Sequence, residues 1–292
     1  MKIAFLGSPT PAATILERLV NSGHTVGQVV TRPDRRRGRG SSHTGTPVAA
    51  TANRLGLEVA YRLEDLRSDE CDLAVVVAYG KIIPSSLLER RAMLNVHFSL
   101  LPRWRGAAPV ERAILAGDAE TGVCVMGIEE TLDTGPVYAE ERVSIGSATS
   151  SELLSLLADR GASLLTDVLS RWPYITPVPQ IGEPTYADKL TPGDFVISPA
   201  MSIRDVARRV RLERSRIDIG PLQARIVRAT ISQESVAPGD VQYASGLHLG
   251  VVDGALEIHE IQSAGGRVMS ADEWWRGAQR HAPMAWRAIN PP

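Results

Sequence analysis

The stretch Asp72-Leu-Ala-Val-Val-Val-Ala78 decides the fold, because it is a short and uninterrupted apolar run. A half-buried strand alternates apolar and polar residues, whereas this run has no polar face. Such a run is typical of a strand in a parallel sheet that helices cover on both sides. We therefore predict a buried central strand here and compare the residues on either side with strand and helix patterns.

Strand and helix patterns alternate on both sides of this run. Lys2–Leu6 is an apolar run that ends at Gly7-Ser8-Pro9, and Pro11–Val20 follows with apolar residues at helical spacing. The other predicted elements are a strand at Thr25–Thr31, a helix at Pro47–Leu55, a strand at Met93–His97, a helix at Ala107–Ala116, and strands at Gly122–Ile128 and Val137–Val143. This alternation predicts a doubly wound, mostly parallel α/β domain with a ligand crevice at the carboxyl ends of its strands. The first turn lacks the three spaced glycines of a dinucleotide site, so we do not expect a nicotinamide cofactor.

The second part of the chain predicts a smaller domain behind a connector. A long amphipathic helix at Ser150–Trp172 closes the first domain, and prolines then recur from Pro173 to Pro199, which is typical of an extended linker. A helix near Ser202–Val210 precedes short strand-like runs at Leu222–Ala229, Leu247–Val252 and Ala255–Ile261. These runs predict a small β-barrel. We place the first domain at residues 1–175, the linker at 176–200 and the second domain at 201–292.

Composition limits the classes of protein that the chain can represent. It has 292 residues, 43% of them apolar, and a formal net charge of −1, so contacts with a nucleic acid must come from local basic patches. Cys71 and Cys124 are the only cysteines, which excludes a disulfide framework or a multi-cysteine zinc site and fits a reducing cytoplasm. No apolar run has the length of a signal peptide or a membrane span. We expect a soluble, cytoplasmic protein without a metal ion.

Two polar side chains interrupt the strand at Met93–His97. Asn95 and His97 are two residues apart, so they project to the same face near the end of the strand. A loop at Leu132-Asp133-Thr134-Gly135 can bring a carboxylate beside them from a neighbouring strand. An amide can stabilise an oxyanion, an imidazole can move a proton, and a carboxylate can orient that imidazole. No serine or cysteine lies in an elbow motif, so the set suits direct acyl transfer through a tetrahedral intermediate.

The residues alone leave a simpler interpretation open. An Asn and a His at the end of a strand can be turn-capping or packing residues without any role in catalysis. Asp133-Thr134-Gly135 also matches the aspartic-protease triplet, but that class requires a second copy of the motif or a dimer of a much shorter all-β chain. We therefore exclude an aspartic protease.

Several stretches closely resemble the methionyl-tRNA formyltransferases, which use 10-formyltetrahydrofolate to formylate the amino group of initiator methionyl-tRNA. They are Asn95–Val110 (NVHFSLLPRWRGAAPV), Leu132–Gly135 (LDTG), Val76–Pro84 (VVAYGKIIP), Thr31–Gly40 (TRPDRRRGRG) and the carboxyl-terminal Gly265–Ala271 (GGRVMSA), which is followed by Glu273-Trp274-Trp275. The resemblance implies a Rossmann-like formyltransferase domain and an OB-like barrel. It also implies a monomer that binds 10-formyltetrahydrofolate and initiator methionyl-tRNA and has no membrane partner.

The resemblance assigns roles to particular residues. Asn95 would donate to the formyl oxygen, His97 would handle protons on the acceptor amine and the departing folate nitrogen, and Asp133 would hold His97 and a water. The folate would lie against a set of residues near the strand ends, largely through backbone groups. That set comprises Tyr79, Gly80, Lys81, Ile82, Ile83, Ser99, Leu100, Leu101, Pro102, Glu129, Glu130 and Leu132.

Two groups of arginines are candidates for contacts with tRNA. The first lies in the loop after the second predicted strand and comprises Arg32, Arg35, Arg36, Arg37 and Arg39. Beside a formyl-transfer site these side chains can neutralise phosphates of an acceptor end without reading sequence, although a charged loop can also be merely solvated. The second group, Arg204, Arg208 and Arg211, recurs on one helical face, and a solvated face is the alternative there.

Rival functions differ mainly in the acceptor. The start of the second domain departs from the usual family pattern at Val196-Ile197-Ser198 and Leu212-Glu213-Arg214-Ser215. The alternatives are therefore a formyltransferase for an amino-sugar nucleotide or another small amine, a 10-formyltetrahydrofolate hydrolase, and an inactive module that binds tRNA or folate. An inactive module would not need Asn95, His97 and Asp133 together.

Overall fold

The structure is a computed structural model that describes residues 1–33, 35–36, 43–67, 70–281 and 284–289. Its contacts divide the chain into two compact units. The first unit comprises Met1–Val110, Glu120–Ser144 and Leu154–Asp188, and the second comprises Glu111–Ala119, Ile145–Leu153 and Lys189–Pro292. The chain therefore passes between the units more than once.

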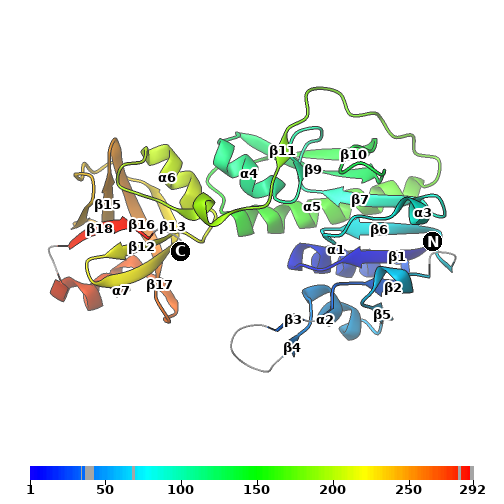
Figure 1. The fold of residues 1–292 in the computed structure, drawn as a ribbon, viewed down its shortest axis with the longest axis horizontal. Coiled ribbons are helices and arrows are strands. Elements are labelled where there is room, and N and C mark those ends of the chain that lie inside the picture. The colour runs from blue at the N-terminus through cyan, green and yellow to red at the C-terminus, as the bar shows by residue number, and fades with distance from the viewer. Residues whose placement is uncertain (34, 37–42, 68–69, 282–283, 290–292) are drawn as a thin grey trace. The chain divides into compact units, whose positions relative to one another are not determined.

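The first unit is built on a mostly parallel seven-stranded sheet (Figure 1). Its strands are β1 (Lys2–Gly7), β2 (Thr25–Val30), β5 (Val59–Ala60), β6 (Leu73–Val77), β7 (Met93–His97), β9 (Glu120–Gly127) and β10 (Val137–Ser144), in the order β10-β9-β7-β6-β1-β2-β5. Neighbours from β5 to β7 run parallel, whereas β9 is antiparallel to both β7 and β10. All five residues of β6 are buried, which confirms the prediction from the apolar run.

Helices cover both faces of this sheet. The helices are α1 (Thr10–Asn21), α2 (Pro47–Arg54), α3 (Ser85–Leu88) and α5 (Ser150–Arg171), with a 3-10 turn η1 at Leu63–Asp65. A Cβ on Gly161 of α5 would meet Val96 at 2.9 Å and Val123 at 3.0 Å, so this glycine lets α5 approach β7 and β9 closely. On the opposite face, Leu63 of η1 packs with Leu6 and Val76 in one apolar cluster. Asn95 and His97 alternate with Val96 and therefore project to this opposite face.

Local signals fix where the helices begin. Thr46 accepts a hydrogen bond on its hydroxyl oxygen from the Ala49 N–H at 3.1 Å, and Pro47 occupies the first helical position of α2. The predicted helix at Ala107–Ala116 is α4, which runs from Pro109 to Ala116. It begins two residues later than predicted, and the N–H groups of Ala107 and Ala108 before it donate to the Ala187 carbonyl.

The segment after α5 is hydrogen-bonded into the first unit. It runs along the β10 edge of the sheet (Figure 1) and pairs with Val137 through an isolated bridge at Val178. Further on, β11 (Tyr186–Ala187) pairs in parallel with β8 (Arg105–Gly106). A second two-stranded ladder joins β3 (Arg35–Arg36) and β4 (His43–Thr44). These short strands were not predicted, because two-residue ladders have no period to detect.

The second unit contains a closed β-barrel. Its strands are β12 (Arg216–Ile219), β13 (Leu222–Ile231), β14 (Asp240–Tyr243), β15 (Leu247–Val251), β16 (Gly254–Ser263), β17 (Val268–Ser270) and β18 (Met284–Ala288). Their order is β13-β12-β18-β14-β15-β16-β17, and an additional pairing of β13 with β16 closes the barrel. This arrangement confirms the predicted small OB-like barrel, although the sequence had predicted only β13, β15 and β16.

Helices α6 (Ile203–Val210) and α7 (Ala271–Ala278) complete the second unit, with 3-10 turns η3 (Pro192–Phe195) and η4 (Gln279–His281). Trp274 of α7 and Trp286 of β18 are 4% and 2% exposed and belong to the same apolar core. The indole N–H of Trp286 donates to the Gly250 carbonyl at 2.9 Å. The sequence had not predicted α7, although Ser270 and Glu273 form a capping box at its start.

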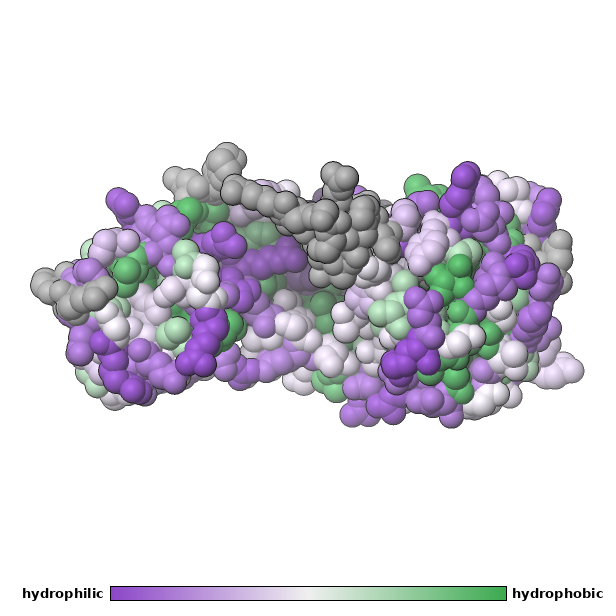
Figure 2. Space-filling view, turned by 90° about the horizontal axis from the view of Figure 1, so that it is seen from below, coloured by the Kyte–Doolittle hydropathy of each residue, from purple (hydrophilic) through white to green (hydrophobic). Residues whose placement is uncertain are grey.

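The described helices are all too short or too polar to cross a membrane. The face shown in Figure 2 mixes hydrophilic and hydrophobic residues. Both cysteines are buried, and each is a free thiol.

Candidate active site

His97 lies at the end of β7, and two groups face its imidazole ring. Its Nε2 lies 2.9 Å from the Trp104 carbonyl oxygen. A carbonyl can only accept, so this hydrogen bond assigns the ring proton to Nε2 and leaves the lone pair of the neutral ring on Nδ1. That Nδ1 lies 3.7 Å from Oδ2 of Asp133, and the two side chains are only 6% and 11% exposed. The carboxylate therefore faces the basic nitrogen in a largely water-excluded place, at a distance longer than a direct hydrogen bond.

Asp133 is held in place by the backbone around it. Its Oδ2 accepts a hydrogen bond from the Gly106 N–H at 2.8 Å. Two residues on, a Cβ on Gly135 would come within 1.9 Å of the Gly127 carbonyl oxygen, so only glycine fits this turn. The sequence prediction that His97 and Asp133 come together from neighbouring strands agrees with this geometry.

Asn95 precedes His97 by two residues on β7 and is partly exposed, whereas His97 is buried. Its backbone pairs with Val76 on β6 and Met126 on β9, in the middle of the sheet. The side chain therefore lies on the His97 face with access to solvent, where an amide can reach a bound molecule.

Residues in the left-handed backbone region gather around this set. The described non-glycine residues with positive φ are Ala78 (46°), Trp104 (63°), Asp133 (54°) and Glu213 (59°). Ala78 directly follows β6, Trp104 lies in the turn after β7, and Asp133 faces His97. Such conformations cost on the order of 1–3 kcal/mol each and persist only where the surrounding structure holds them. Their clustering is typical of a site that needs fixed geometry.

The predicted folate segment Tyr79–Ile83 follows β6 directly. Tyr79 and Ile83 are buried in an apolar cluster that Ile128 also contacts, whereas Ile82 is 81% exposed. Burial raises the pKa of the Tyr79 hydroxyl, and that hydroxyl has no hydrogen-bond partner among the described residues. Gly80 has a φ of +75°, and Lys81 is exposed.

Arg32 contacts this folate segment. Its Nε donates to the Tyr79 carbonyl at 3.0 Å, and its terminal nitrogen donates to the Gly80 carbonyl at 2.5 Å. A Cβ on Gly80 would clash with the guanidinium group. The structure thus places Arg32, which the sequence assigned to tRNA, on the backbone of the predicted folate segment.

The other predicted folate residues lie in two loops. In the turn after β7, the buried Ser99 hydroxyl donates to the Arg103 carbonyl at 2.6 Å, and Leu101 packs with Met126. Leu100 is partly exposed, and the Pro102 carbonyl accepts from the Thr185 N–H at 3.2 Å.

In the loop after β9, Glu129, Glu130 and Leu132 are all exposed, and Leu132 is 62% accessible. Glu129 accepts a hydrogen bond from the Thr134 hydroxyl at 3.3 Å.

The predicted tRNA arginines are found in different surroundings. Arg35 and Arg36 form β3, while Arg37 and Arg39 lie outside the described residues. On α6, Arg204 is exposed, and Arg208 lies 3.8 Å from Asp205 and against Gly117.

Arg211 is the third arginine of this helical group. Its Nε donates to the Ala148 carbonyl at 2.8 Å, and burial, followed by the nearby Arg208, lowers the pKa of its guanidinium. Arg211 is therefore hydrogen-bonded to the Ala148 carbonyl within the second unit, a contact that its helical spacing in the sequence could not reveal.

Sequence reasoning missed the residues that support His97 and Asp133. Trp104 supplies the carbonyl for His97. Thr185 contacts the Trp104–Gly106 turn, and Gln180 contacts both that turn and the Asp133 loop. Gln180 and Thr185 lie in the proline-rich stretch that was interpreted as a linker. Backbone contacts of this kind have no sequence period, so the amino-acid pattern held no signal for them.

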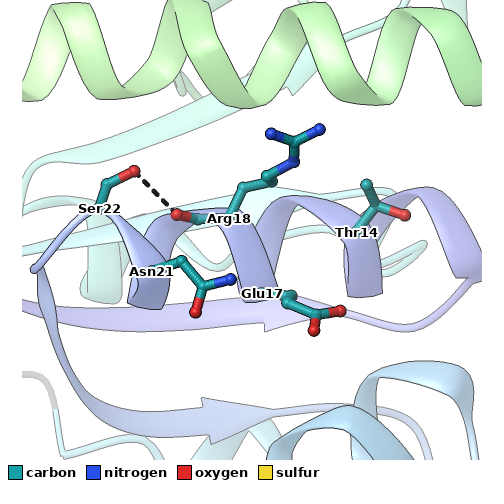
Figure 3. A pocket seen from close by; sticks show the side chains of 5 residues that line it. All are labelled: Thr14, Glu17, Arg18, Asn21 and Ser22. Carbon is teal, nitrogen blue, oxygen red and sulfur yellow. Dashed lines mark hydrogen bonds between the residues drawn. The ribbon is translucent and has the colours of Figure 1, made fainter.

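A surface pocket on α1 lies apart from this set. It is lined by Thr14, Glu17, Arg18, Asn21 and Ser22 (Figure 3). The Ser22 hydroxyl donates to the Arg18 carbonyl at 2.9 Å, and Arg18 pairs with Asp159 of α5. Glu17 likewise pairs with Arg54 of α2. Its charged groups serve helix packing, so we assign no chemistry to this pocket.

The fold and the polar set together define a group-transfer protein with a Rossmann-like domain and a barrel. Residues 1–169 match the family described as formyl transferase, and residues 189–279 match its carboxyl-terminal domain. The chain belongs to the formyl transferase family. Its resemblance to methionyl-tRNA formyltransferases is confirmed by full-length relatives. Those of Roseobacter denitrificans and Paracoccus denitrificans are 39% and 40% identical, over 95% of this chain and 96% and 97% of the relatives.

Solved structures support the fold. HypX from Aquifex aeolicus in complex with tetrahydrofolic acid is similar with a TM-score of 0.64 and 17% identity over 94% of this chain, which spans 47% of that protein. An N-formyltransferase from Helicobacter canadensis, in complex with folinic acid and dTDP-3-aminofucose, has a TM-score of 0.64 and 17% identity over 88% of this chain and 98% of its own. At this identity the likeness concerns the fold alone.

Proposed function

We propose that this protein transfers a formyl group from 10-formyltetrahydrofolate to the amino group of initiator methionyl-tRNA. The observation that carries the proposal is the placement of His97 between the Trp104 carbonyl at 2.9 Å and the Asp133 carboxylate at 3.7 Å. Relatives that share 39–40% of their residues with nearly the whole chain carry the name methionyl-tRNA formyltransferase. A fixed imidazole beside a carboxylate is the arrangement that a proton transfer to or from an amine needs.

The residues near the strand ends fit a folate. A pterin ring is flat and largely apolar with polar edges, so it suits backbone groups flanked by apolar side chains. Two apolar side chains among these residues are exposed: Ile82 at 81% and Leu132 at 62%. Ile82 is next to Ile83 in the sequence, and Leu132 is four residues after Ile128. Ile83 and Ile128 belong to or pack against the same apolar cluster. The backbone of Tyr79–Ile83 and the loop at Glu129–Leu132 would hold the folate. Bound there, it supplies the formyl group.

Each member of the polar set has a distinct task in the proposed reaction. The Asn95 amide donates to the formyl oxygen as negative charge develops on it. Nδ1 of His97 accepts the proton that the acceptor amine loses on attack, and the ring later returns a proton to the departing nitrogen. The Asp133 carboxylate then faces an imidazolium and stabilises its positive charge. No covalent enzyme intermediate is needed.

The basic residues supply contacts for a large anionic acceptor. Arg35, Arg36, Arg37 and Arg39 follow β2, whose carboxyl end lies on the same edge of the parallel sheet as that of β6. Guanidinium groups in the stretch that follows β2 in the sequence can neutralise tRNA phosphates without reading bases. Arg204 and Arg208 of α6, with Arg211 directly after this helix, offer a second contact. We further propose that the protein acts as a cytoplasmic monomer.

One acceptor assay tests this proposal. The protein and 10-formyltetrahydrofolate are incubated with charged initiator tRNA, with charged elongator tRNA, or with no acceptor. Selective formylation of the initiator supports the proposal. Folate turnover without an acceptor would instead indicate a hydrolase. Absence of reaction in every arm would leave either an amino-sugar nucleotide or another small amine as the acceptor, or an inactive module that binds tRNA or folate.

A further inference from the structure

We propose that Gln180 is a positioning residue that keeps Asp133 and the Trp104 carbonyl in place around His97. The inference rests on the proposed function and deepens it, because it concerns the geometry of the same site. Gln180 lies in the segment after α5 and is partly buried. It does not belong to the catalytic, folate or tRNA residues that the sequence predicted. Its role follows from four hydrogen bonds made by one carboxamide.

The donor side of the carboxamide binds the Asp133 loop. Nε2 of Gln180 donates to the Asp133 carbonyl at 2.9 Å and to the Gly135 carbonyl at 2.8 Å. Both hydrogens of the amide are therefore used on the turn that holds Asp133 in the left-handed region, at a φ of 54°. Since a strained backbone keeps its conformation only while neighbouring groups hold it, the two bonds fix where the Asp133 carboxylate lies.

The acceptor side binds the turn that follows His97. Oε1 of Gln180 accepts from Nε of Arg105 at 3.1 Å and from a terminal nitrogen of Arg105 at 2.6 Å. Arg105 is the residue after Trp104, whose carbonyl fixes the His97 proton, and before Gly106, whose N–H holds Asp133. The orientation of the amide is unambiguous, because a flip would set oxygen against two carbonyls and N–H groups against a guanidinium.

The backbone around Gln180 extends the same connection. Val178 exchanges two hydrogen bonds of 2.8 Å with Val137, just beyond the Asp133 loop. The Thr185 hydroxyl accepts from the Trp104 N–H at 2.9 Å, and its carbonyl accepts from the Arg105 N–H at 2.9 Å. The segment from Val178 to Ala187 thus binds both loops that face His97, and Gln180 is the side chain that joins them.

Two substitutions separate positioning from folding. Gln180→Met keeps the size of the side chain and removes all four hydrogen bonds. Gln180→Glu keeps the acceptor for Arg105 and sets an oxygen against the two carbonyls. The matched control is Ile181→Ala, the next residue, whose side chain is 84% exposed. Each protein is compared with wild type for melting temperature, for kcat and for KM of both substrates.

We expect both Gln180 variants to fold and to lose about 10- to 100-fold in kcat, because small misplacements of reacting groups cost rate rather than binding. Both KM values stay within about threefold of wild type, and Ile181→Ala keeps wild-type kcat. A folded Gln180→Met protein with wild-type kcat would overturn the proposal. A raised KM at unchanged kcat would also overturn it, since Gln180 would then be a substrate contact.

Amide hydrogen exchange provides a readout that is independent of the reaction. In Gln180→Met the peptides that contain residues 104–107 and 133–137 exchange faster than in wild type and in Ile181→Ala, while peptides from β6 are unchanged. Unchanged exchange in both loops would contradict the positioning role. If wild type transferred no formyl group, the proposed function would fail, and exchange alone would still decide whether Gln180 holds the two loops.

Discussion

His97 can accept a proton through only one of its ring nitrogens, because the other donates to the Trp104 carbonyl. This carbonyl belongs to a residue with a φ of 63°, so the backbone is bent to bring the acceptor to the ring. Asp133, also in the left-handed region, faces the remaining nitrogen. At the residue scale the site is therefore built from strained backbone as much as from side chains.

Removing the Asn95 amide tests its proposed contact with the formyl oxygen. Asn95→Ala should lower turnover about 100- to 1000-fold, equivalent to ~2.7–4 kcal/mol of transition-state stabilisation. The side chain is partly exposed, so the variant should fold. Steady-state formylation and a circular dichroism melt measure the two effects. Full activity in a folded variant would remove Asn95 from the reaction.

Arg32 gives a prediction that separates two interpretations of one residue. Because its guanidinium binds the Tyr79 and Gly80 carbonyls, Arg32→Ala should weaken folate binding by about 10-fold and leave tRNA affinity nearly unchanged. Fluorescence titration with a folate and filter binding of charged tRNA measure the two affinities, with Arg54→Ala as the control. The reverse outcome would favour the tRNA contact that the sequence predicted for Arg32.

At the element scale, the sequence predicted the regular strands well but not the irregular segment that is hydrogen-bonded to the loops beyond them. β6 and β7 were recognised from an apolar run and from a strand pattern with polar residues on one face, and the structure places both as predicted. The segment at Val178–Ala187 has neither pattern, since its partners are carbonyls and N–H groups of distant loops. Its prolines indicated a linker, whereas hydrogen bonds to β8 and Val137 hold it in the first unit.

A partly buried ion pair stabilises the start of the second unit. Both carboxylate oxygens of Asp194 bind Arg112, at 2.8 and 3.2 Å, and the two side chains are 16% and 21% exposed. Burial alone would raise the pKa of Asp194, but hydrogen bonds from the Thr191 backbone and from Arg112 outweigh it and lower the pKa. A lowered pKa in the folded state contributes stability above the unfolded value of about 3.9, and this stability is lost as the pH falls through the folded pKa.

Asp194→Ala should therefore lower the free energy of unfolding by about 1–3 kcal/mol at neutral pH. The difference from wild type should shrink below about pH 4, where the carboxylate begins to be protonated in the unfolded chain. The exposed pair of Arg142 and Glu120 is the control, and Glu120→Ala should cost less than about 1 kcal/mol. Denaturant melts at several pH values measure both. A pH-independent difference for Asp194→Ala would refute the assignment.

The arginine loop after β2 gives the second prediction at this scale. Reversing the charges of Arg36 and Arg37 to Glu should weaken tRNA binding and reduce the slope of log affinity against log salt by about 1.4–1.8, the loss of two phosphate contacts. Folate affinity should change little. Binding of charged initiator tRNA over a range of salt concentrations tests this, and an unchanged slope would exclude phosphate contacts by these two residues.

At the scale of the whole molecule, the sequence anticipated an α/β domain followed by a barrel, and both are present. The barrel strands β12, β14 and β18 escaped prediction because each has only four or five residues, whereas closure depends on the long-range pairing of β13 with β16. Such pairing follows from tertiary packing and cannot be deduced from local periodicity. The proximity of His97 and Asp133 agrees with the sequence prediction, because the end of a strand and the loop after a neighbouring strand could be located from the pattern of residues.

We propose that His97 and its neighbours transfer a formyl group to a methionyl-tRNA. The most direct measurement follows a labelled formyl carbon from 10-formyltetrahydrofolate onto the α-amino group of charged initiator tRNA, with wild type and with His97→Ala. We predict rapid labelling by wild type and a rate lower by at least about 100-fold for the folded variant. Labelling at equal rates, or no labelling by wild type, would contradict the account.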